Sequence, residues 1–418
     1  MKKSEYTIHI VGSGVSGLVA AKVLEQQGFH PTIIEATNTA GGRLKTDFTE
    51  NYQLDQGFQV LLTAYPMVKK YLDLERLKLQ PLLPGAMIFK GRKKAIIGDP
   101  RRSLNFIFPS LFSGIGNISD KIKIFQLSRK LKRKTLAAIF SEDEITTLDY
   151  LKTVGFSENI IADFFKPFFG GIYLEPDLNT SSRMFEFVFK MFAEGLATIP
   201  QGGIAKIPEQ LKDNLTHTKF IFNETVKELN ETSITLSDGQ KLNTHAVLIT
   251  ANTFGLIQEE RYRDIHWKRC DNLYFETEER SISKPIIGLV ADEEALINNL
   301  FYHTSIATNQ TSVKELLSVT IVKNHGYNTE ELCSKVEEEL RTLCGIDKVR
   351  FLKHYAIEKA LPNLRDIKND RDFKRIKLGK NVFMAGDYLL NGSLNAAILS
   401  GEKSAMALAQ YLQVHSPS

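Results

Sequence analysis

A glycine-rich turn near the start of the chain constrains the fold more than any other feature of the sequence. Residues 8–24 read IHIVGSGVSGLVAAKVL, and Gly12, Gly14 and Gly17 have the spacing G-x-G-x-x-G. The stretch is apolar and follows two lysines, as in a secretory signal peptide. Three glycines would weaken an apolar helix at its centre, so we expect folded core rather than a signal sequence.

The segments around these glycines complete a βαβ unit. The run 6–11 is typical of a β-strand, and 17–28 has helical apolar spacing with Gly28 as a stop. The next run, 30–36, predicts a second strand that ends in Glu35. An acid at this position can accept hydrogen bonds from a ribose diol, so the unit is typical of dinucleotide binding.

Each glycine has a physical task in such a unit. Gly12 permits the tight turn, Gly14 lets a pyrophosphate approach the backbone, and Gly17 lets the helix pack closely on the strand. The helix N-terminus offers N–H groups and the positive end of its dipole to the phosphates. This fingerprint alone does not distinguish NAD from FAD.

Two further stretches favour FAD. In ATNTAGGRLKT, Gly42 and Arg43 let the chain pass close to a flat ligand while a cation meets its phosphates, although GGR alone also fits a plain glycine turn. Near the C-terminus, the run 381–387 predicts a buried strand that ends in Gly386 and Asp387, before a long helix. That acid can hold a polyol hydroxyl, and the helix N-terminus can face negative charge on a reduced flavin ring.

Together these motifs resemble the flavin-containing amine oxidase superfamily, which includes monoamine and polyamine oxidases, protoporphyrinogen oxidases and phytoene-desaturase-type enzymes. The matching stretches are VGSGVSGL, GGRLKT, LDQGFQVL, PQGGIAKIPEQL and VFMAGDYLLNGSLNAAILSG, with the acid Glu35. They are spread from one end of the chain to the other. The phenylalanine-rich middle is closer to the protoporphyrinogen oxidase and phytoene desaturase branch. The resemblance implies FAD as the cofactor.

The resemblance also implies which residues bind FAD. The glycine turns, the acid and the C-terminal motif would hold the pyrophosphate, the ribose and the ribityl chain. Gly57 and Phe58 would lie near the flavin ring, Asn395 and Ala396 would face its pyrimidine end, and the backbone of Val226 would meet the adenine. In chain order, the predicted FAD-binding residues are Gly12, Gly14, Val15, Ser16, Glu35, Ala36, Gly42, Arg43, Gly57, Phe58, Val226, Gly386, Asp387, Asn395 and Ala396.

The expected fold class is α/β, with a Rossmann-like FAD-binding domain and a discontinuous α+β substrate domain. The FAD-binding domain is predicted to combine a parallel sheet with a β-meander and to comprise 1–65, 195–255 and 355–418. The substrate-binding domain would comprise 66–194 and 256–354.

The meander is predicted over 220–251, with a hairpin turn at Asp238 and Gly239, before HAVLIT returns to the main sheet. In the substrate-binding domain, KPIIGLVADEE and ELLSVTIV predict strands, and NTEELCSKVEEELRTLCG predicts an amphipathic helix that ends at Gly345. The sequence has no second G-x-G-x-x-G. We therefore expect the substrate itself, rather than NAD(P)H, to give up a hydride to the flavin.

Phenylalanines cluster in the predicted substrate domain. The chain has 26 of them, and the clusters are NFIFPSLF, DFFKPFFGGIY and RMFEFVFKMF. Aromatic residues at helical spacing usually pack in a core, and that interpretation is favoured for most of them. A few could instead line a pocket for an apolar or aromatic small-molecule substrate.

A basic segment follows the first of these clusters. Residues 103–119 are uncharged but too short to span a bilayer, and 121–134 carries seven Lys or Arg with interleaved Ile, Phe and Leu. A solvated basic helix face is the favoured interpretation. The alternative is peripheral contact of 103–134 with an anionic membrane, which would suit a lipid-soluble isoprenoid or tetrapyrrole.

Composition excludes several classes of protein. A net charge of +4 is too weak to indicate nucleic acid as a partner. The chain has three cysteines, Cys270, Cys333 and Cys344, and none forms a C-x-x-C pair, so we expect buried thiols and a cytoplasmic setting. No metal-binding cluster or Ser-His-Asp set stands out. Because no cysteine follows Cys344, the FAD is predicted to be non-covalent, unlike that of monoamine oxidases.

The predicted function is an FAD-dependent oxidoreductase that dehydrogenates an apolar substrate at a C–N or C–C bond. Three alternatives stay open: an isoprenoid or carotenoid desaturase or isomerase at a membrane surface, a soluble amine oxidase that releases hydrogen peroxide, and a non-catalytic FAD-binding protein. No catalytic base is assigned. Gln56 and Gln59, beside the predicted flavin-facing pair, are candidates for polar contacts with substrate or flavin.

Overall fold

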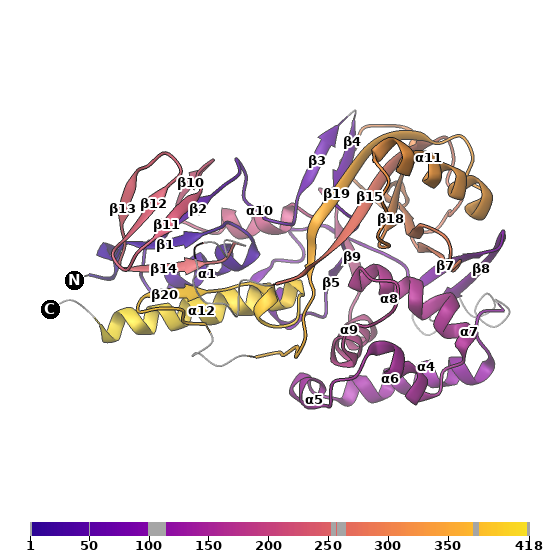
Figure 1. The fold of residues 1–418 in the computed structure, drawn as a ribbon, viewed down its shortest axis with the longest axis horizontal. Coiled ribbons are helices and arrows are strands. Elements are labelled where there is room, and N and C mark those ends of the chain that lie inside the picture. Colours follow the sequence, from indigo (N-terminus) through magenta and orange to yellow (C-terminus); the bar gives the residue numbers. More distant parts are fainter. Residues whose placement is uncertain are drawn as a thin grey trace.

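The structure is a computed structural model that describes residues 2–49, 51–98, 114–251, 256, 265–370 and 376–415. Two lobes lie side by side in Figure 1, and the long strands β15 (Trp267–Thr277) and β19 (Arg350–Pro362) run next to each other through the middle of the view. Both ends of the chain lie on the left lobe, where the Tyr6 hydroxyl donates to the Leu412 carbonyl at 3.5 Å.

The left lobe is built on a five-stranded parallel sheet with the order β10-β2-β1-β14-β20. Parallel strands covered on both faces are rich in apolar residues, and the four strands from β2 to β20 are buried accordingly, while the edge strand β10 is partly exposed. The strands are β1 (Ile8–Val11), β2 (Thr32–Glu35), β10 (Lys219–Phe222), β14 (Ala246–Ile249) and β20 (Val382–Met384).

The two faces of this sheet divide between two layers. On one face, Ile10, Leu248 and the strand residues that point the same way pack with the helices α1 (Val15–Gln26) and α12 (Leu394–Val414). Val11 and the residues aligned with it pack with the antiparallel meander. The meander strands are β11 (Val226–Leu229), β12 (Ser233–Leu236) and β13 (Lys241–Asn243).

One detail of the meander prediction was wrong. The run Lys219–Phe222 does not join the meander but pairs in parallel with β2, at the edge of the main sheet. The hairpin at Asp238 and Gly239 is confirmed, because these residues connect β12 to β13 and Gly239 has φ +88°. An edge strand and a meander strand share the same residue preferences, so the sequence alone does not separate them.

The right lobe contains a seven-stranded sheet with the order β19-β15-β18-β17-β16-β7-β8. One face is apolar and packs against α11 (Thr329–Glu339) through Leu332, Val336 and their partners. The opposite face carries Cys270, Asn272 and Tyr274 of β15, because side chains alternate along a strand. The remaining strands are β7 (Gly85–Lys90), β8 (Lys93–Gly98), β16 (Ile287–Val290), β17 (Ile297–Tyr302) and β18 (Glu315–Ile321).

A layer of helices lies below this sheet in Figure 1. Polar residues cap several of them: Asn117 forms a capping box with Asp120, and Thr146 and Ser181 accept from backbone N–H groups of the first turn. The helices are α4 (Ile118–Arg133), α5 (Leu136–Ser141), α6 (Thr147–Val154), α7 (Glu158–Ile160), α8 (Lys166–Tyr173) and α9 (Ser182–Glu194).

Short elements join the lobes. They comprise the hairpin β3 (Thr46–Thr49) and β4 (Tyr52–Asp55), the helices α2 (Pro66–Tyr71) and α10 (Lys206–Asp213), and a three-stranded sheet of β5 (Leu61–Leu62), β9 (Ala197–Pro200) and β6 (Leu79–Pro81). The predicted fold class, α/β with a parallel sheet and a β-meander, is confirmed. The predicted domain boundaries stay a prediction.

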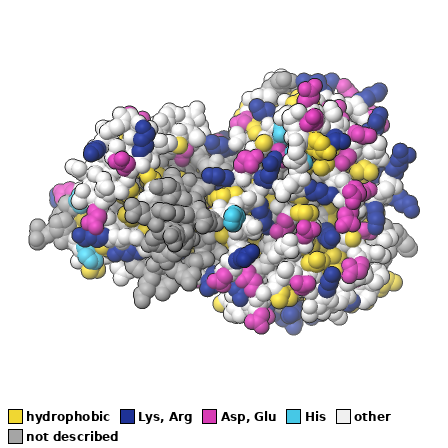
Figure 2. Space-filling model, viewed as in Figure 1, with side chains coloured by type: hydrophobic (Ala, Val, Ile, Leu, Met, Phe, Trp, Pro, Cys, Tyr) yellow, Lys and Arg dark blue, Asp and Glu magenta, His cyan; other side chains and the backbone are white. Residues whose placement is uncertain are grey.

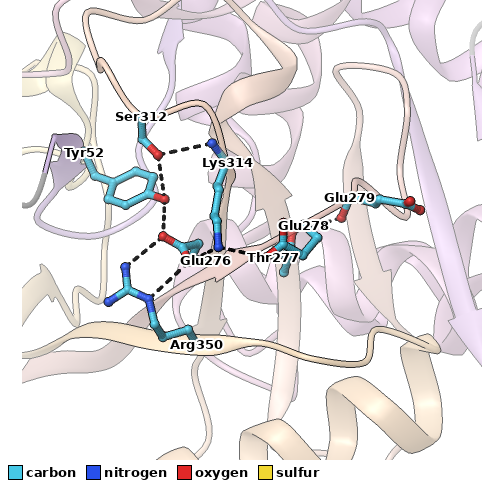
Figure 3. Close-up of polar contacts among 8 residues, drawn as sticks. All are labelled: Tyr52, Glu276, Thr277, Glu278, Glu279, Ser312, Lys314 and Arg350. Carbon is cyan, nitrogen blue, oxygen red and sulfur yellow. Dashed lines mark hydrogen bonds and ion pairs between the residues drawn. The ribbon is translucent and has the colours of Figure 1, made fainter.

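A polar cluster fixes the β3–β4 hairpin to the seven-stranded sheet. Figure 3 shows the buried Tyr52 hydroxyl donating to Glu276 at 2.6 Å, where Arg350 and Lys314 also meet the carboxylate. The pKa of Glu276 is lowered to about 2, chiefly by hydrogen bonds from Arg350. The turn at 56–58, which follows β4, therefore starts from a fixed position.

No helix in the described segments has both the length and the apolar character needed to cross a bilayer. On the face shown in Figure 2, Lys and Arg side chains are interspersed with Asp and Glu over both lobes. Such mixing gives no support to a nucleic-acid footprint, which needs clustered positive charge.

Candidate functional site

A cavity of about 1190 Å³ extends from the carboxyl ends of the parallel strands to the helical layer of the right lobe. Pockets for one small ligand usually measure about 300–1,000 Å³, so this cavity has room for a cofactor and a substrate together. Its lining changes in character along its length. Glycines and hydrogen-bonding groups line the end in the left lobe, and phenylalanines line the end in the right lobe.

Two glycine turns form the first end. Gly12 has φ +102°, and Gly14 is the N-cap of α1, where the backbone N–H groups of Val15 and Ser16 begin the helix. A Cβ atom on Gly42 would lie 3.1 Å from the Cα atom of Gly14, so the two turns touch through bare backbone. This corner suits a diphosphate, because α1 supplies N–H groups and no side chain blocks the approach.

Glu35 lies at the end of β2 with both carboxylate oxygens engaged. Oε2 accepts from the backbone N–H and the hydroxyl of Ser13, at 2.9 and 2.8 Å, and Oε1 accepts from the same two groups of Thr37, both at 2.9 Å. Burial opposes ionisation, but these hydrogen bonds outweigh it and lower the pKa of Glu35. The site therefore presents an ionised acceptor, which suits a ribose diol.

Arg43 and Asp387 join the two ends of the chain across the cavity. Arg43 lies 2.5 Å from the Asp387 carboxylate, and its guanidinium also lies over the Trp267 ring. The Asp387 side chain is 5% exposed and that of Arg43 is 41% exposed. One face of the guanidinium is thus held in place while the group stays accessible to an anion.

The turn after β4 lies against the seven-stranded sheet. Gly57 has φ +97°, and a Cβ atom there would lie 2.9 Å from Ile357 of β19. Gln56 donates to Asp47 at 3.1 Å, and Gln59 donates to the Arg43 carbonyl at 3.2 Å. Both glutamines line the cavity with Gly57 and Phe58, at the passage between its two ends.

Four predicted residues do not line the cavity. Ala36 is exposed, and Val226, the first residue of β11, is buried between the meander and the parallel sheet. The Asn395 side chain accepts from the backbone N–H of Met67 at 3.0 Å, and the Ala396 N–H donates to the Ser393 hydroxyl at 3.0 Å. The lining residues from this part of α12 are instead Leu394 and Ala397.

The other eleven predicted residues all lie on the cavity wall. They come from two distant parts of the sequence, 12–58 and 386–387. Nine of them meet along the carboxyl ends of β1, β2 and β20, and Gly57 and Phe58 lie in the turn after β4. They are Gly12, Gly14, Val15, Ser16, Glu35, Gly42, Arg43, Gly57, Phe58, Gly386 and Asp387.

The phenylalanine clusters divide between core and cavity. Phe165, Phe185 and Phe187 are fully buried in the core of the helical layer. Five phenylalanines of the same helical segments line the cavity, and they are Phe164, Phe168, Phe169, Phe189 and Phe192. Phe169 belongs to both groups, because it is also buried in the core. The predicted residues Phe106, Phe108 and Phe112 lie outside the described residues.

Comparisons with known proteins agree with this geometry. The family model for flavin-containing amine oxidoreductases matches residues 15–409.

The chain belongs to the flavin-containing amine oxidoreductase family.

Two relatives match nearly the whole length of the chain. It is 21% identical to protoporphyrinogen oxidase 2 of Arabidopsis thaliana, over 97% of this chain and 94% of that protein. It is 23% identical to 15-cis-phytoene desaturase of Solanum lycopersicum, over 96% of this chain and 77% of that protein.

Solved structures of the same fold cover the chain equally well. A protoporphyrinogen oxidase-like protein from Exiguobacterium sp. 255-15 superposes with a TM-score of 0.71 at 16% identity, over 97% of this chain and 99% of that one. Putrescine oxidase bound to putrescine gives a TM-score of 0.69 at 15% identity, again over 97% and 99%. As a member of this family, the protein is an FAD-dependent oxidoreductase.

The sequence analysis missed two parts of the cavity wall in this flavoenzyme. One is α4, which contributes Lys121, Ile124, Phe125 and Ser128. The other is the seven-stranded sheet, which contributes residues from all seven strands, including Cys270, Asn299, Thr320 and Ile357. Period-2 alternation could have identified which strand residues share a face, but it does not indicate which face meets a ligand.

Proposed function

We propose that this enzyme dehydrogenates an apolar substrate at a C–N or C–C bond and passes a hydride to non-covalently bound FAD. The observation that carries the proposal is the continuity of the cavity, which joins the glycine turns to a wall of five helical phenylalanines. A substrate held against that wall would reach the turn at Gly57 and Phe58, where the two ends of the cavity meet.

The charges of the lining support an apolar rather than a cationic substrate. Glu35 and Asp387 are the acids of the described lining, and both already have partners. The lining near the aromatic end carries Lys121 and Lys268. A substrate ammonium group would find no unpaired carboxylate in the described lining, so the amine oxidase alternative is the weaker one.

The residues of this chain have three tasks in the proposed reaction. The glycine turns and Arg43 bind the diphosphate-containing cofactor, which supplies a two-electron acceptor when bound. The phenylalanines orient an apolar substrate, and their bulk excludes water from the site of transfer. No side chain is assigned as a base.

The cysteines support non-covalent binding. Cys270 is the one cysteine on the described cavity wall, and burial raises the pKa of its thiol to about 12. A thiol with that pKa is almost wholly protonated at neutral pH and is a poor nucleophile. Cys333 and Cys344 belong instead to the region of α11, on the far face of the seven-stranded sheet. Cys333 is half-buried, not buried as predicted.

The test uses the purified holoenzyme. Heat or acid denaturation should release all of the flavin into the supernatant as FAD. Under anaerobic conditions, an apolar donor panel should bleach the flavin absorbance, while a panel of primary amines should leave it unchanged. Peroxide formation with the amines, or flavin that stays with the precipitated protein, would contradict the proposal.

A second candidate, a desaturase or isomerase acting on a membrane-dissolved isoprenoid, is favoured by α4. Ile118, Ile122 and Phe125 are 72%, 51% and 41% exposed and recur at one-turn intervals on one side of this helix. The same helix lines the cavity through Phe125 and its neighbours. Exposed apolar residues beside Lys and Arg suit an anionic membrane surface.

Vesicle sedimentation distinguishes this candidate. The enzyme should pellet with vesicles that contain phosphatidylglycerol, and Ile118→Ser with Ile122→Ser should keep it in solution. Ile145→Ser is the matched control, because Ile145 is also exposed, at 41%, but lies outside α4. Equal loss of binding in the control, or no binding by the wild type, would eliminate the membrane candidate.

A further inference from the structure

The sheet face that meets the cavity carries a strip of neutral polar side chains. Asn272 on β15 pairs in register with Thr320 on β18, and Thr320 pairs in turn with Asn299 on β17. Ser318 lies two residues before Thr320, on the same face. Asn299 and Thr320 line the cavity, while Asn272 and Ser318 lie in the same row and are buried. We call these four residues the polar strip.

The hydrogen bonds of the polar strip leave donors unused. The hydroxyls of Ser318 and Thr320 both donate to Asn272 Oδ1 at 3.1 Å. Asn272 Nδ2 is buried and makes no hydrogen bond to any residue that the structure describes. Asn299 Nδ2 makes one long contact, of 3.3 Å, with Thr320 Oγ1, so its second N–H group stays available.

Neighbouring backbone makes room for the strip. Asn298 donates to Asn299 Oδ1 at 2.8 Å and to the Pro167 carbonyl at 2.9 Å, which fixes the orientation of the Asn299 amide. A Cβ atom on Gly171 of α8 would lie 2.8 Å from both asparagine side chains. Gly171 also lines the cavity, so α8 passes over the amides without covering them with a side chain.

Burying unused amide donors is costly. A buried polar group without a partner destabilises the fold, and apolar residues on the opposite sheet face avoid that cost. A ligand group that accepts from the spare N–H of Asn299, the donor on the cavity wall, would remove the penalty for that donor. Phenylalanines on the facing wall offer no hydrogen bonds of this kind, so the polar strip is where the cavity selects a polar group.

The charge of the surroundings defines the kind of group. Lys268 on β15 is paired with Glu175 at 2.5 Å and donates to Thr180 at 2.9 Å, so this neighbouring pair is neutral as a whole. The strip itself consists of amides and hydroxyls. Such a site suits a neutral oxygen acceptor better than a carboxylate or an ammonium group, because it supplies no counter-charge.

We infer that the polar strip binds a neutral carbonyl or hydroxyl oxygen of an otherwise apolar substrate. Asn299 makes the contact through its spare N–H group, because the Thr320 hydroxyl already donates to Asn272 Oδ1. Thr320 holds the Asn299 amide in position, and Asn272 and Ser318 complete the hydrogen-bond network around it. This inference rests on the proposed function, because it takes the phenylalanine wall to be the binding surface for the rest of the substrate. A substrate so held is fixed at one oxygen and packed along its length.

The test compares two probes of nearly equal shape on the holoenzyme, 4-phenylcyclohexanone and phenylcyclohexane. Binding is measured by calorimetric titration and by the difference spectrum of the bound flavin. The ketone should bind about tenfold more tightly than the hydrocarbon, as expected for one or two hydrogen bonds. Thr320→Val and Asn299→Leu should each reduce that preference several-fold, and Thr320→Ser should retain it.

Ile357→Val is the matched control, because Ile357 lies on the same sheet face and forms no hydrogen bond through its side chain. It should change the binding of both probes by the same factor. Retained FAD in every variant verifies folding. Thr320→Val and Asn299→Leu change different strands, so each variant tests the inference separately.

Three results would overturn the inference. Equal binding of both probes by the wild type would show that the polar strip does not bind the oxygen, and it would leave the proposed apolar site intact. Tighter binding of 4-phenylcyclohexylamine or 4-phenylcyclohexanecarboxylate than of the ketone would overturn the neutral assignment. Failure of the hydrocarbon and the ketone alike to bind would overturn both the strip and the proposed function.

Discussion

The two ends of the cavity are built in different ways. At the end in the left lobe, the lining is mostly backbone, placed by glycines and by hydrogen-bonded side chains such as Glu35. At the end in the right lobe, the lining is side chains from helices and strands that are far apart in sequence. Backbone geometry leaves a short sequence signature, whereas a wall of side chains depends on how whole elements pack.

The largest effect should separate the two roles of the phenylalanines. Phe165 is fully buried in the helical core, so Phe165→Ala should lower the free energy of unfolding by about 3–5 kcal/mol. Phe168 is half-buried and lines the cavity, so Phe168→Ala should cost less stability but weaken binding of an apolar probe. Thermal melting and phenylcyclohexane titration measure the two effects. If both variants lost the same free energy of unfolding, the buried and the cavity-lining phenylalanines would not have distinct roles.

The glycine end should be almost as sensitive, but with a different result. A Cβ atom on Gly17 would overlap the Gly12 carbonyl oxygen and lie 2.9 Å from the Thr250 hydroxyl. Gly17→Ala should therefore push α1 away from β1, cost about 3 kcal/mol, and yield colourless protein. Absorbance after purification and a melting curve check this. Gly326→Ala, at a position with no atom within 4 Å of the added carbon, should stay yellow and stable.

The same contrast explains what could be predicted from the sequence. The βαβ unit and α12 follow from local patterns of glycine, apolar spacing and acid, as do the cavity residues in the glycine turns and at the strand ends. Val15, Ser16, Gly57 and Phe58 were predicted through the family resemblance. The edge position of β10 could not be predicted, because pairing with β2 depends on a partner nearly two hundred residues away. The orientation of Asn395 toward Met67 has the same cause, since α2 is remote in sequence.

The aromatic wall and the polar strip were less accessible still. Helical spacing places Phe165 and Phe168 one turn apart, but only the packing of α8 and α9 sends one to the core and the other to the cavity. Thr320 and Asn299 lie in ordinary strands, and nothing in their local sequence indicates that their sheet face meets a cavity instead of a helix. Tertiary contacts decide such assignments.

The junction between the two ends should respond to pH through Asp55, which ends β4. Burial raises its pKa from 3.8 to about 6, although Thr46 and the Ile204 N–H donate to Oδ1. Because the folded protein binds the proton more tightly than the unfolded chain, stability from this group is complete below pH 4 and is lost as pH rises through 6. The loss should be about 3 kcal/mol.

Asp55→Asn removes this titration and keeps an acceptor for Thr46 and Ile204. Melting temperatures of the two proteins, measured from pH 4 to pH 8, should therefore diverge between pH 4 and about pH 6, with the variant the more stable at the upper end, and the difference should stay constant above that interval. Parallel profiles across that interval would show that Asp55 does not titrate in the folded protein.

The smallest effect concerns two glutamates, Glu25 near the C-terminus of α1 and Glu35 at the end of β2. Glu35 and Glu25 both accept backbone N–H and hydroxyl donors, and in both cases hydrogen bonds outweigh burial and lower the pKa. Only Glu35 lines the cavity. Glu35→Ala should weaken FAD affinity about tenfold, equivalent to about 1.4 kcal/mol, while the fold stays intact.

Glu25→Ala is the matched control, because it loses the same kind of hydrogen bonds where Thr216 and Thr218 lead into β10. It should lower the melting temperature slightly and leave FAD affinity unchanged in fluorescence titrations of the apoprotein. If both variants lost FAD equally, the carboxylate at the end of β2 would act on the cofactor only through the stability of the sheet. A loss confined to Glu35→Ala instead requires the carboxylate to act locally, at the ribose or through the Ser13 and Thr37 backbone that it holds in the cavity wall.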